Sequence, residues 1–188
     1  MENERQRGNP PGLTNSYVAQ NIRQVRQSIG MDLRTLSEKL TEAGRKLSVS
    51  GVSKVELGDR RVDVDDLTAI AYALGTTPAA LLAPPAGDSA FTGVPAGHTT
   101  EEVQAWLGGD ATLTQSGLVA YWQQQAQDAQ FEIETTKLKL ESLAGHETAA
   151  ELFRPHYEER IERFRTRLQE ANLRLLELDP RARPFGES

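Results

Sequence analysis

The sequence has no cysteine among its 188 residues, and it has only three histidines. Disulfide bonds, thiolate metal ligands and thiol nucleophiles are therefore excluded, which fits a reducing compartment. The histidines are too few and too scattered for a convincing metal site. We expect no bound metal and no cofactor.

Long apolar runs are missing as well. No stretch approaches the roughly 18 consecutive apolar residues of a membrane-spanning helix, and the polar start lacks the apolar segment of a signal peptide. Alternation of apolar and polar residues, which is typical of strands, nowhere reaches a convincing length. We therefore expect a cytoplasmic protein of the all-α class.

Charge is distributed unevenly along the chain. The formal net charge is −6, but residues 1–83 carry +1 and residues 84–188 carry −7. An acidic protein is repelled by nucleic acid, yet here the acidity belongs to the second part of the chain. The first part remains free to bind a polyanion, and the acidic part is either a solvated helical exterior or a surface for a basic partner.

The first 83 residues predict a disordered arm followed by five short helices. Residues 1–15 are polar and contain Gly, Pro and Asn, which is typical of a disordered arm. From residue 17 onward, apolar residues recur with helical spacing and are interrupted by glycines at C-terminal positions. Four polar residues stand where N-caps are required: Asp32, Ser48, Asp63 and Thr77. Residues 16–83 are predicted to form one helical domain.

Composition changes after this domain. Residues 84–98, "PPAGDSAFTGVPAGH", contain three prolines and three glycines without a period, and we interpret them as a linker. Thr99 and Glu102 then have the spacing of a capping box for a brief helix. Residues 99–179 are predicted to form a helical assembly module, and residues 180–188 a disordered tail.

Two apolar stripes in this module have the alternating 4,3 spacing of coiled coils. They consist of Trp122, Ala126, Ala129, Ile133, Thr136, Leu140 and Leu143, and of Tyr157, Ile161, Phe164, Leu168, Ala171, Leu175 and Leu178. The break at "AGHE" between them lets the chain fold back as an antiparallel hairpin. Because apolar residues also lie off the two seams, we expect two hairpins to pair, which predicts a homodimer through residues 115–178.

The stretch "LSVSGVSKVELGDRR" contains the most informative helix of the first domain. A helix from Ser48 to Leu57 buries only two valines, so it presents a face of short side chains at its N-terminal end. Such a face lets a helix enter the major groove of DNA, and arginines placed after the helix can meet phosphates. Gly51 within it permits close approach either of DNA or of the preceding helix.

Three stretches together resemble the lambda-repressor-like helix-turn-helix regulators, also called the XRE family, and most of all their actinobacterial or actinophage type. They are "NIRQVRQSIGMDLRTLSEKL", "LSVSGVSKVELGDRR" and "DLTAIAYALGTTPAALL", and they cover roughly Val18 to Leu82. The resemblance implies a five-helix DNA-binding domain whose third helix reads bases. Leu33 departs from the glutamine that the family often has there, and "TEAGRK" lengthens the connector before the third helix.

The resemblance also implies roles for individual residues. Base contacts are expected from Val49, Ser50, Ser53 and Lys54, and phosphate contacts from Arg34, Arg45, Lys46, Arg60 and Arg61. For Arg45 and Lys46 a merely solvated connector is the alternative. Arg26 and Glu56 match an internal ion pair that fixes the third helix to the first.

These observations predict a sequence-specific regulator of transcription that binds double-stranded DNA in the nucleoid, with repression as the default because it needs only occupancy of a promoter. No serine has a lysine placed as a partner, so we expect no enzymatic activity. An antitoxin-type interaction protein is the alternative, in which the acidic C-terminal helices bind a partner protein while the N-terminal domain autoregulates. A small-ligand sensor is a third hypothesis.

Overall fold

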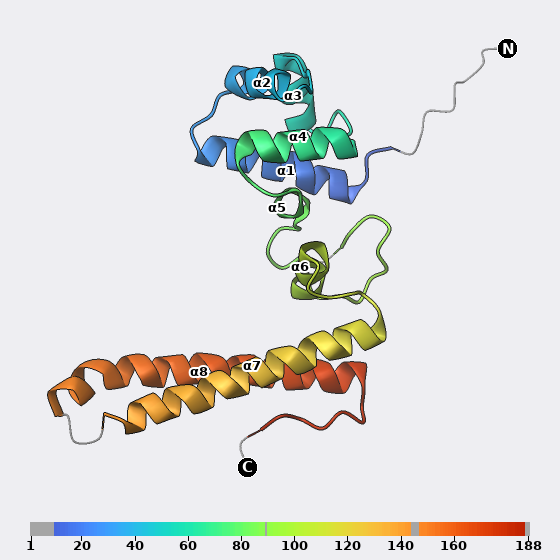
Figure 1. The fold of residues 1–188 in the computed structure, drawn as a ribbon. Helices are drawn as coiled ribbons and strands as arrows, with labels where there is room; N and C mark the ends of the chain where they lie inside the picture. Colours follow the sequence, from blue (N-terminus) through green and yellow to red (C-terminus); the bar gives the residue numbers. More distant parts are fainter. Residues whose placement is uncertain (1–9, 89, 144–146, 187–188) are drawn as a thin grey trace. The chain divides into compact units, whose positions relative to one another are not determined.

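The computed structural model describes residues 10–88, 90–143 and 147–186 (Figure 1). The helices are α1 (Leu13–Ser28), α2 (Leu33–Glu42), α3 (Val49–Glu56), α4 (Val64–Leu74), α5 (Pro78–Leu82), α6 (Thr100–Gly108), α7 (Gln115–Glu141) and α8 (Glu147–Leu178). Within the described ranges, the only β-structure is an isolated bridge between Phe91 and Val94. The all-α prediction is confirmed. None of the described helices combines the length and the apolar character that crossing a membrane requires.

Local capping explains where the helices α2 to α5 begin. The side chain of each predicted N-cap accepts a hydrogen bond from an amide three residues later, at 2.7 Å for Asp32, 3.1 Å for Ser48, 2.7 Å for Asp63 and 3.1 Å for Thr77. Each bond satisfies one of the amides that lack a partner in the first turn of a helix. Gly75 ends α4 with a φ of 68°, a left-handed conformation that favours glycine.

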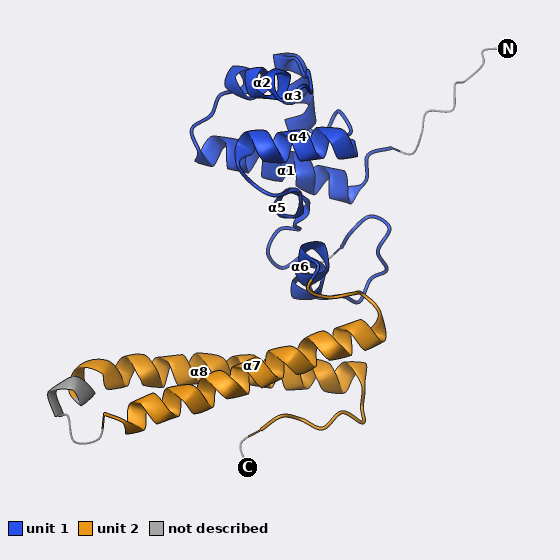
Figure 2. Ribbon diagram, viewed as in Figure 1, with its two compact units in different colours: residues 1–109 blue, residues 110–188 orange. Residues whose placement is uncertain are grey.

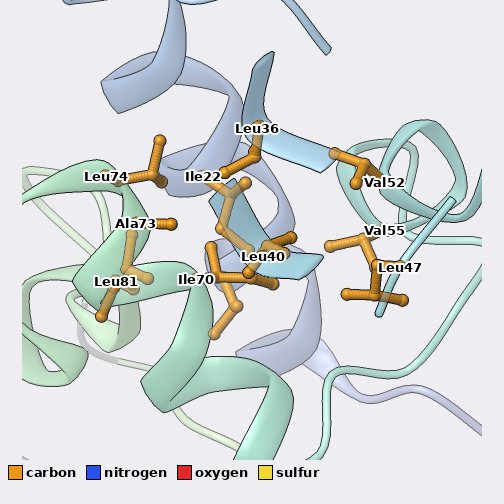
Figure 3. Close-up of a cluster of buried hydrophobic side chains, with 12 residues drawn as sticks. Ile22, Leu36, Leu40, Leu47, Val52, Val55, Ile70, Ala73, Leu74 and Leu81 are labelled. Atoms are coloured by element: carbon orange, nitrogen blue, oxygen red, sulfur yellow. The ribbon is translucent and has the colours of Figure 1, made fainter. Parts of the chain in front are cut away.

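The first five helices share one core (Figure 3). Its buried members are Val18, Ile22, Leu36, Leu40, Leu47, Val52, Val55, Ile70, Ala71, Ala73, Leu74 and Leu81. Ile22, Leu36 and Leu40 are completely buried, and each such side chain contributes about 1.5–3 kcal/mol relative to an exposed one. The core therefore fixes α3 through Val52 and Val55 and leaves its other face free.

The chain divides into two compact units, residues 1–109 and residues 110–188 (Figure 2). The predicted boundaries lay earlier, with a linker at residues 84–98 and the second module beginning at residue 99. In the structure, α6 contacts α5 and belongs to the first unit. The boundary expected from composition differs from this division because proline and glycine content indicates backbone conformation, but it does not indicate which side chains make tertiary contacts.

Residues of the expected linker pack on α1. The Tyr17 hydroxyl donates a hydrogen bond to Asp88 at 2.7 Å, and Thr14 and Thr92 exchange two hydrogen bonds between amide and hydroxyl groups. The ring of Phe91 lies 6.5 Å from that of Tyr17 and 6.0 Å from that of Trp106. These contacts connect Asp88 and Thr92 to α1, and Phe91 to both α1 and α6.

The first helix begins earlier than expected. α1 starts at Leu13, so the last residues of the arm predicted at 1–15 are helical, and residues 1–9 lie outside the described part of the chain. The apolar period that predicts this helix starts only at Tyr17. A helix can continue through polar residues such as Thr14 and Asn15, which carry no periodic signal.

The second unit is a hairpin of α7 and α8 (Figure 1). Its buried apolar cluster consists of Trp122, Ala126, Ala129, Ile133, Ile161, Leu168, Ala171 and Leu175, all of which belong to the two predicted stripes. Leu118 of α7 is also buried and lies outside the stripes. The break expected at residues 144–147 lies mostly outside the described residues, and Glu147 is already the first residue of α8.

The end of the chain is docked on the hairpin as far as residue 186. Asn172 donates a hydrogen bond to the Phe185 carbonyl at 2.5 Å and accepts one from the Phe185 amide at 2.8 Å. Ala182 and Phe185 pack against the buried cluster of the hairpin. The predicted disordered tail at residues 180–188 is therefore ordered where it is described; residues 187–188 lie outside that range.

Candidate nucleic-acid interface

Helix α3 presents the face that the sequence predicts. Val52 and Val55 are buried in the core, while Val49, Ser50 and Lys54 are exposed and Ser53 is half-buried. The Ser48 hydroxyl caps the helix and lies 3.1 Å from the Ser50 hydroxyl. The residues expected to contact bases thus share a surface of short side chains with one lysine.

An ion pair fixes the far end of α3 to α1. Arg26 Nε and Nη2 donate to the two carboxylate oxygens of Glu56 at 2.5 and 2.8 Å. A third donor, Nη1, binds the Met31 carbonyl at 2.7 Å. The two side chains are only 11% and 7% exposed, and the hydrogen bond to Glu56 raises the pKa of Arg26. The structure thus contains the pair expected between Arg26 and Glu56, in bidentate geometry.

Gly51 leaves room on the outer side of α3. A β-carbon built there lies 3.3 Å from Ser48 Oγ and 3.6 Å from Leu47 Cδ2, and no other described atom outside its own helical turn comes within 4 Å. Both neighbours belong to the connector that precedes α3. Packing against α2 therefore does not require a glycine at this position.

The basic residues around α3 fall into two groups. Lys46, Lys54 and Arg61 are exposed, and their side chains form no hydrogen bond or ion pair within the described part of the chain. Arg34 forms an ion pair with Glu38 at 2.9 Å, but these side chains are 81% and 58% exposed. An exposed pair of this kind contributes little to stability, so Arg34 can exchange its partner at low cost.

Arg45 and Arg60 are held by carboxylates of α4. Arg45 Nε donates to Asp66 Oδ1 at 2.6 Å and its Nη2 to Asp63 Oδ2 at 2.6 Å, with Asp65 3.9 Å from Nη1. Arg60 Nη2 donates to the second oxygen of Asp66 at 3.1 Å. The carboxylate of Asp66 is 1% exposed, whereas the arginines are 35% and 43% exposed.

These bonds also perturb titration. The hydrogen bond to Asp66 raises the pKa of Arg45. The Asp66 amide, helped by the nearby guanidinium of Arg45, holds the pKa of Asp63 below its ordinary value. One carboxylate, that of Asp63, therefore serves both as the N-cap of α4 and as a partner of the connector.

Sequence reasoning missed the role of Asp66. The sequence indicates Asp66 only as the residue three positions after the Asp63 cap, and it connects neither residue to Arg45 or Arg60. The signal available was the coincidence of "RK", "DRR" and "DVDD" within 22 residues of an otherwise apolar domain. Burial of one of three aspartates cannot be read from such a pattern, because it depends on how α4 packs.

The hairpin carries a separate apolar surface. Phe131, Leu138 and Leu173 are exposed although they are large and apolar. Leu173 also borders an open hollow of about 350 Å³, whose lining residues are Ile133, Arg165, Leu168, Gln169, Asn172, Leu173 and Leu176. Comparison of the chain with protein families, with curated proteins and with solved structures found no match.

Proposed function

We propose that this protein is a sequence-specific regulator of transcription that binds double-stranded DNA, acts as a repressor, and inserts α3 into the major groove. The observation that carries the proposal is the outer face of α3. It consists of short side chains, it is fixed from behind by Val52, Val55 and the Glu56 ion pair, and unpaired cations surround it. The order and packing of α1 to α5 support a lambda-repressor-like arrangement of the first unit.

The dimensions of the major groove explain why short side chains on α3 favour DNA binding. The major groove is about 12 Å wide, close to the diameter of a helix with its side chains, so a helix enters deeply only where its side chains are short. Ser50, Ser53 and Gly51 meet this condition. Hydroxyl groups bond either donors or acceptors on base edges, and Lys54 can donate to guanine. Lys46 and Arg61, placed before and after the helix, are suited to phosphates.

Salt dependence of DNA binding tests the proposal. Lys46, Arg61 and Arg34, which can leave the exposed Glu38, give about six phosphate contacts in a dimer, and this predicts a loss of affinity of at least about 10³ between 50 and 200 mM salt. Binding is measured by fluorescence anisotropy on a site selected from random duplexes. A flat salt response, or no selected site at all, would remove the DNA hypothesis.

Single substitutions separate base readers from phosphate contacts. Lys54→Ala or Ser50→Ala is expected to cost about 1–3 kcal/mol on the selected site and to leave nonspecific binding nearly intact. Arg61→Ala is expected to weaken all sequences and to reduce the salt slope by about 1 per first unit. Lys39→Ala is the matched control, because Lys39 is exposed and unpaired within the described residues but lies on α2. If all four variants behave alike, α3 is not the reader.

We further propose that the hairpin dimerises the protein. Phe131, Leu138, Leu173 and Leu176 lie on the hairpin outside its two buried stripes, and a second hairpin packed on them would complete a four-helix bundle. Sedimentation of the full chain at micromolar concentration should then give a dimer. The double variant Leu173→Gln, Leu176→Gln should give a monomer, whereas Leu57→Gln, which changes an exposed leucine of the first unit, should remain dimeric. A monomeric wild-type chain would contradict dimerisation.

The antitoxin-type alternative retains some support from charge. Residues 110–188 carry a formal charge of −4, and the remaining −3 of the acidic part lies in residues 84–109, which belong to the first unit. The acidity is therefore shared between units and is not concentrated on the hairpin. This alternative predicts that a basic protein encoded beside this one binds residues 110–188 and displaces no DNA. If residues 110–188 and this basic protein do not associate, the antitoxin-type alternative is contradicted and the proposal of a transcriptional regulator remains.

A further inference from the structure

Two arginines from opposite ends of α3 bind the same buried carboxylate. Arg45 lies in the connector before the helix, and Arg60 lies in the turn after it. Their guanidinium groups donate to different oxygens of Asp66, at 2.6 and 3.1 Å. The carboxylate is thereby shared between two segments that the chain separates by the whole length of α3.

Both arginines keep donors for another partner. A guanidinium has five N–H donors in a rigid planar fork. Arg45 uses one for Asp66 and one for Asp63, and Arg60 uses one for Asp66. The remaining donors belong to side chains that are 35% and 43% exposed. The carboxylate therefore orients each fork without saturating it.

We propose that Asp66 is the positioning residue for phosphate contacts at both ends of α3: it holds Arg45 and Arg60 so that their free donors meet the DNA backbone on either side of the reading helix. The inference rests on the proposed DNA-binding function. An arginine that is already oriented loses less conformational freedom when it binds a phosphate, so both affinity and register depend on a residue that never touches DNA.

A purely structural role for Asp66 is the competing explanation. In that case the two ion pairs fasten the ends of α3 to α4, and Arg45 and Arg60 make no phosphate contact. The two explanations differ in the salt slope of binding. A phosphate contact adds about 0.9 to the slope, whereas a fastening inside the protein releases no counterions from DNA.

The experiment compares Asp66→Asn with Asp65→Asn in the full chain. Both variants remove one negative charge from neighbouring positions of α4. Asp65, however, is exposed, and its carboxylate lies 3.9 Å from Arg45 Nη1, too far for a hydrogen bond. Because Arg45 and Arg60 bind different oxygens of Asp66, the amide of Asp66→Asn places an NH₂ donor, instead of an acceptor, against one of the two guanidinium groups. We expect Asp66→Asn to reduce the salt slope by about 1.8 per first unit and Asp65→Asn to leave it unchanged. Slopes are measured below the melting temperature of each variant.

A double-mutant comparison completes the test. Arg45→Ala together with Arg60→Ala should reduce the slope by the same amount, and adding Asp66→Asn to that pair should reduce it no further. If Asp66→Asn does not fold, Arg45→Lys with Arg60→Lys takes its place. Lysine keeps the positive charge but lacks the planar guanidinium that Asp66 orients. If phosphate binding depends on this orientation, the salt slope should fall in the double lysine variant; if it does not, the slope should equal that of the wild type.

The outcomes are distinct. A wild-type slope in Asp66→Asn, or in the double lysine variant, overturns the positioning role and leaves DNA binding standing. An equal reduction of the salt slope in Asp66→Asn and Asp65→Asn also overturns the positioning role, because the loss of one negative charge would then explain both results. A wild-type chain that binds no DNA overturns the proposed function, and the inference with it.

Discussion

Replacing Glu56 by Gln exchanges one carboxylate oxygen for an amide nitrogen and should destabilise the first unit severely. Glu56 accepts two charge-assisted bonds from Arg26, at 2.5 and 2.8 Å, in a site where both side chains are nearly buried. The amide keeps one acceptor and places a donor against a guanidinium nitrogen. Breaking a buried pair costs about 3–5 kcal/mol, because the remaining charge stays buried without a partner.

The matched control is Glu38→Gln. It makes the same chemical change in an Arg–Glu pair of similar length, 2.9 Å to Arg34, but on the surface. Exposed pairs of this spacing contribute about 0.3–0.5 kcal/mol, so the two variants should differ roughly tenfold in their effect on stability. The contrast isolates burial as the cause.

Hydrogen exchange of the backbone amides provides the assay, because it reports each unit of the chain separately. Since about 1.4 kcal/mol corresponds to a factor of ten, a cost of about 3–5 kcal/mol should make core amides of α1 and α3 exchange about 10² to 10⁴ times faster in Glu56→Gln. Amides of α7 and α8 should not change. A loss below about 1 kcal/mol, or equal losses in the two variants, would refute the claim that this pair fixes α3.

Three further predictions concern the rest of the fold. Ile133→Ala removes a buried side chain of the hairpin and should cost about 2–5 kcal/mol, measured by urea denaturation with α7 amides as reporters. Gly75→Ala places a β-carbon at a φ of 68° and should cost about 1–2 kcal/mol, and an unchanged melting temperature would contradict it. Burial, and secondarily the hydrogen bond to Asp88, raises the pKa of Tyr17 to about 12, so the folded state keeps a proton that the unfolded state releases near 10. Stability should fall between these two pH values, and Tyr17→Phe should remove that part of the fall.

Local signals predicted the helices of the first unit well. The caps Ser48 and Asp63 need only an amide three residues later, and their bonds form wherever the following residues are helical. The apolar stripes of the hairpin depend only on spacing, and their central members, such as Ile133 and Leu168, are buried. Such features depend only on residues that are close together in the sequence, so they can be predicted from the sequence alone.

Contacts between distant segments were not predictable in the same way. Asp66 lies 21 residues from Arg45, and nothing in the composition distinguishes it from its exposed neighbour Asp65. The start of α8 shows a second limit. Leu152 and Phe153 are exposed and Pro155 lies inside the helix, so the ten residues before Tyr157 carry no helical period although they are helical.

The packing of Asp88, Phe91 and Thr92 on α1 has a practical consequence for anyone who wants to isolate the first unit. A fragment that ends at residue 98, where composition suggests a boundary, would lose α6 and with it the buried Val103 and the ring that packs on Phe91. A fragment that ends after Gly109 retains both. For the same reason a protease should spare the bonds next to Asp88, Phe91 and Thr92 despite the prolines and glycines around them, because these three side chains already have partners in α1 or α6.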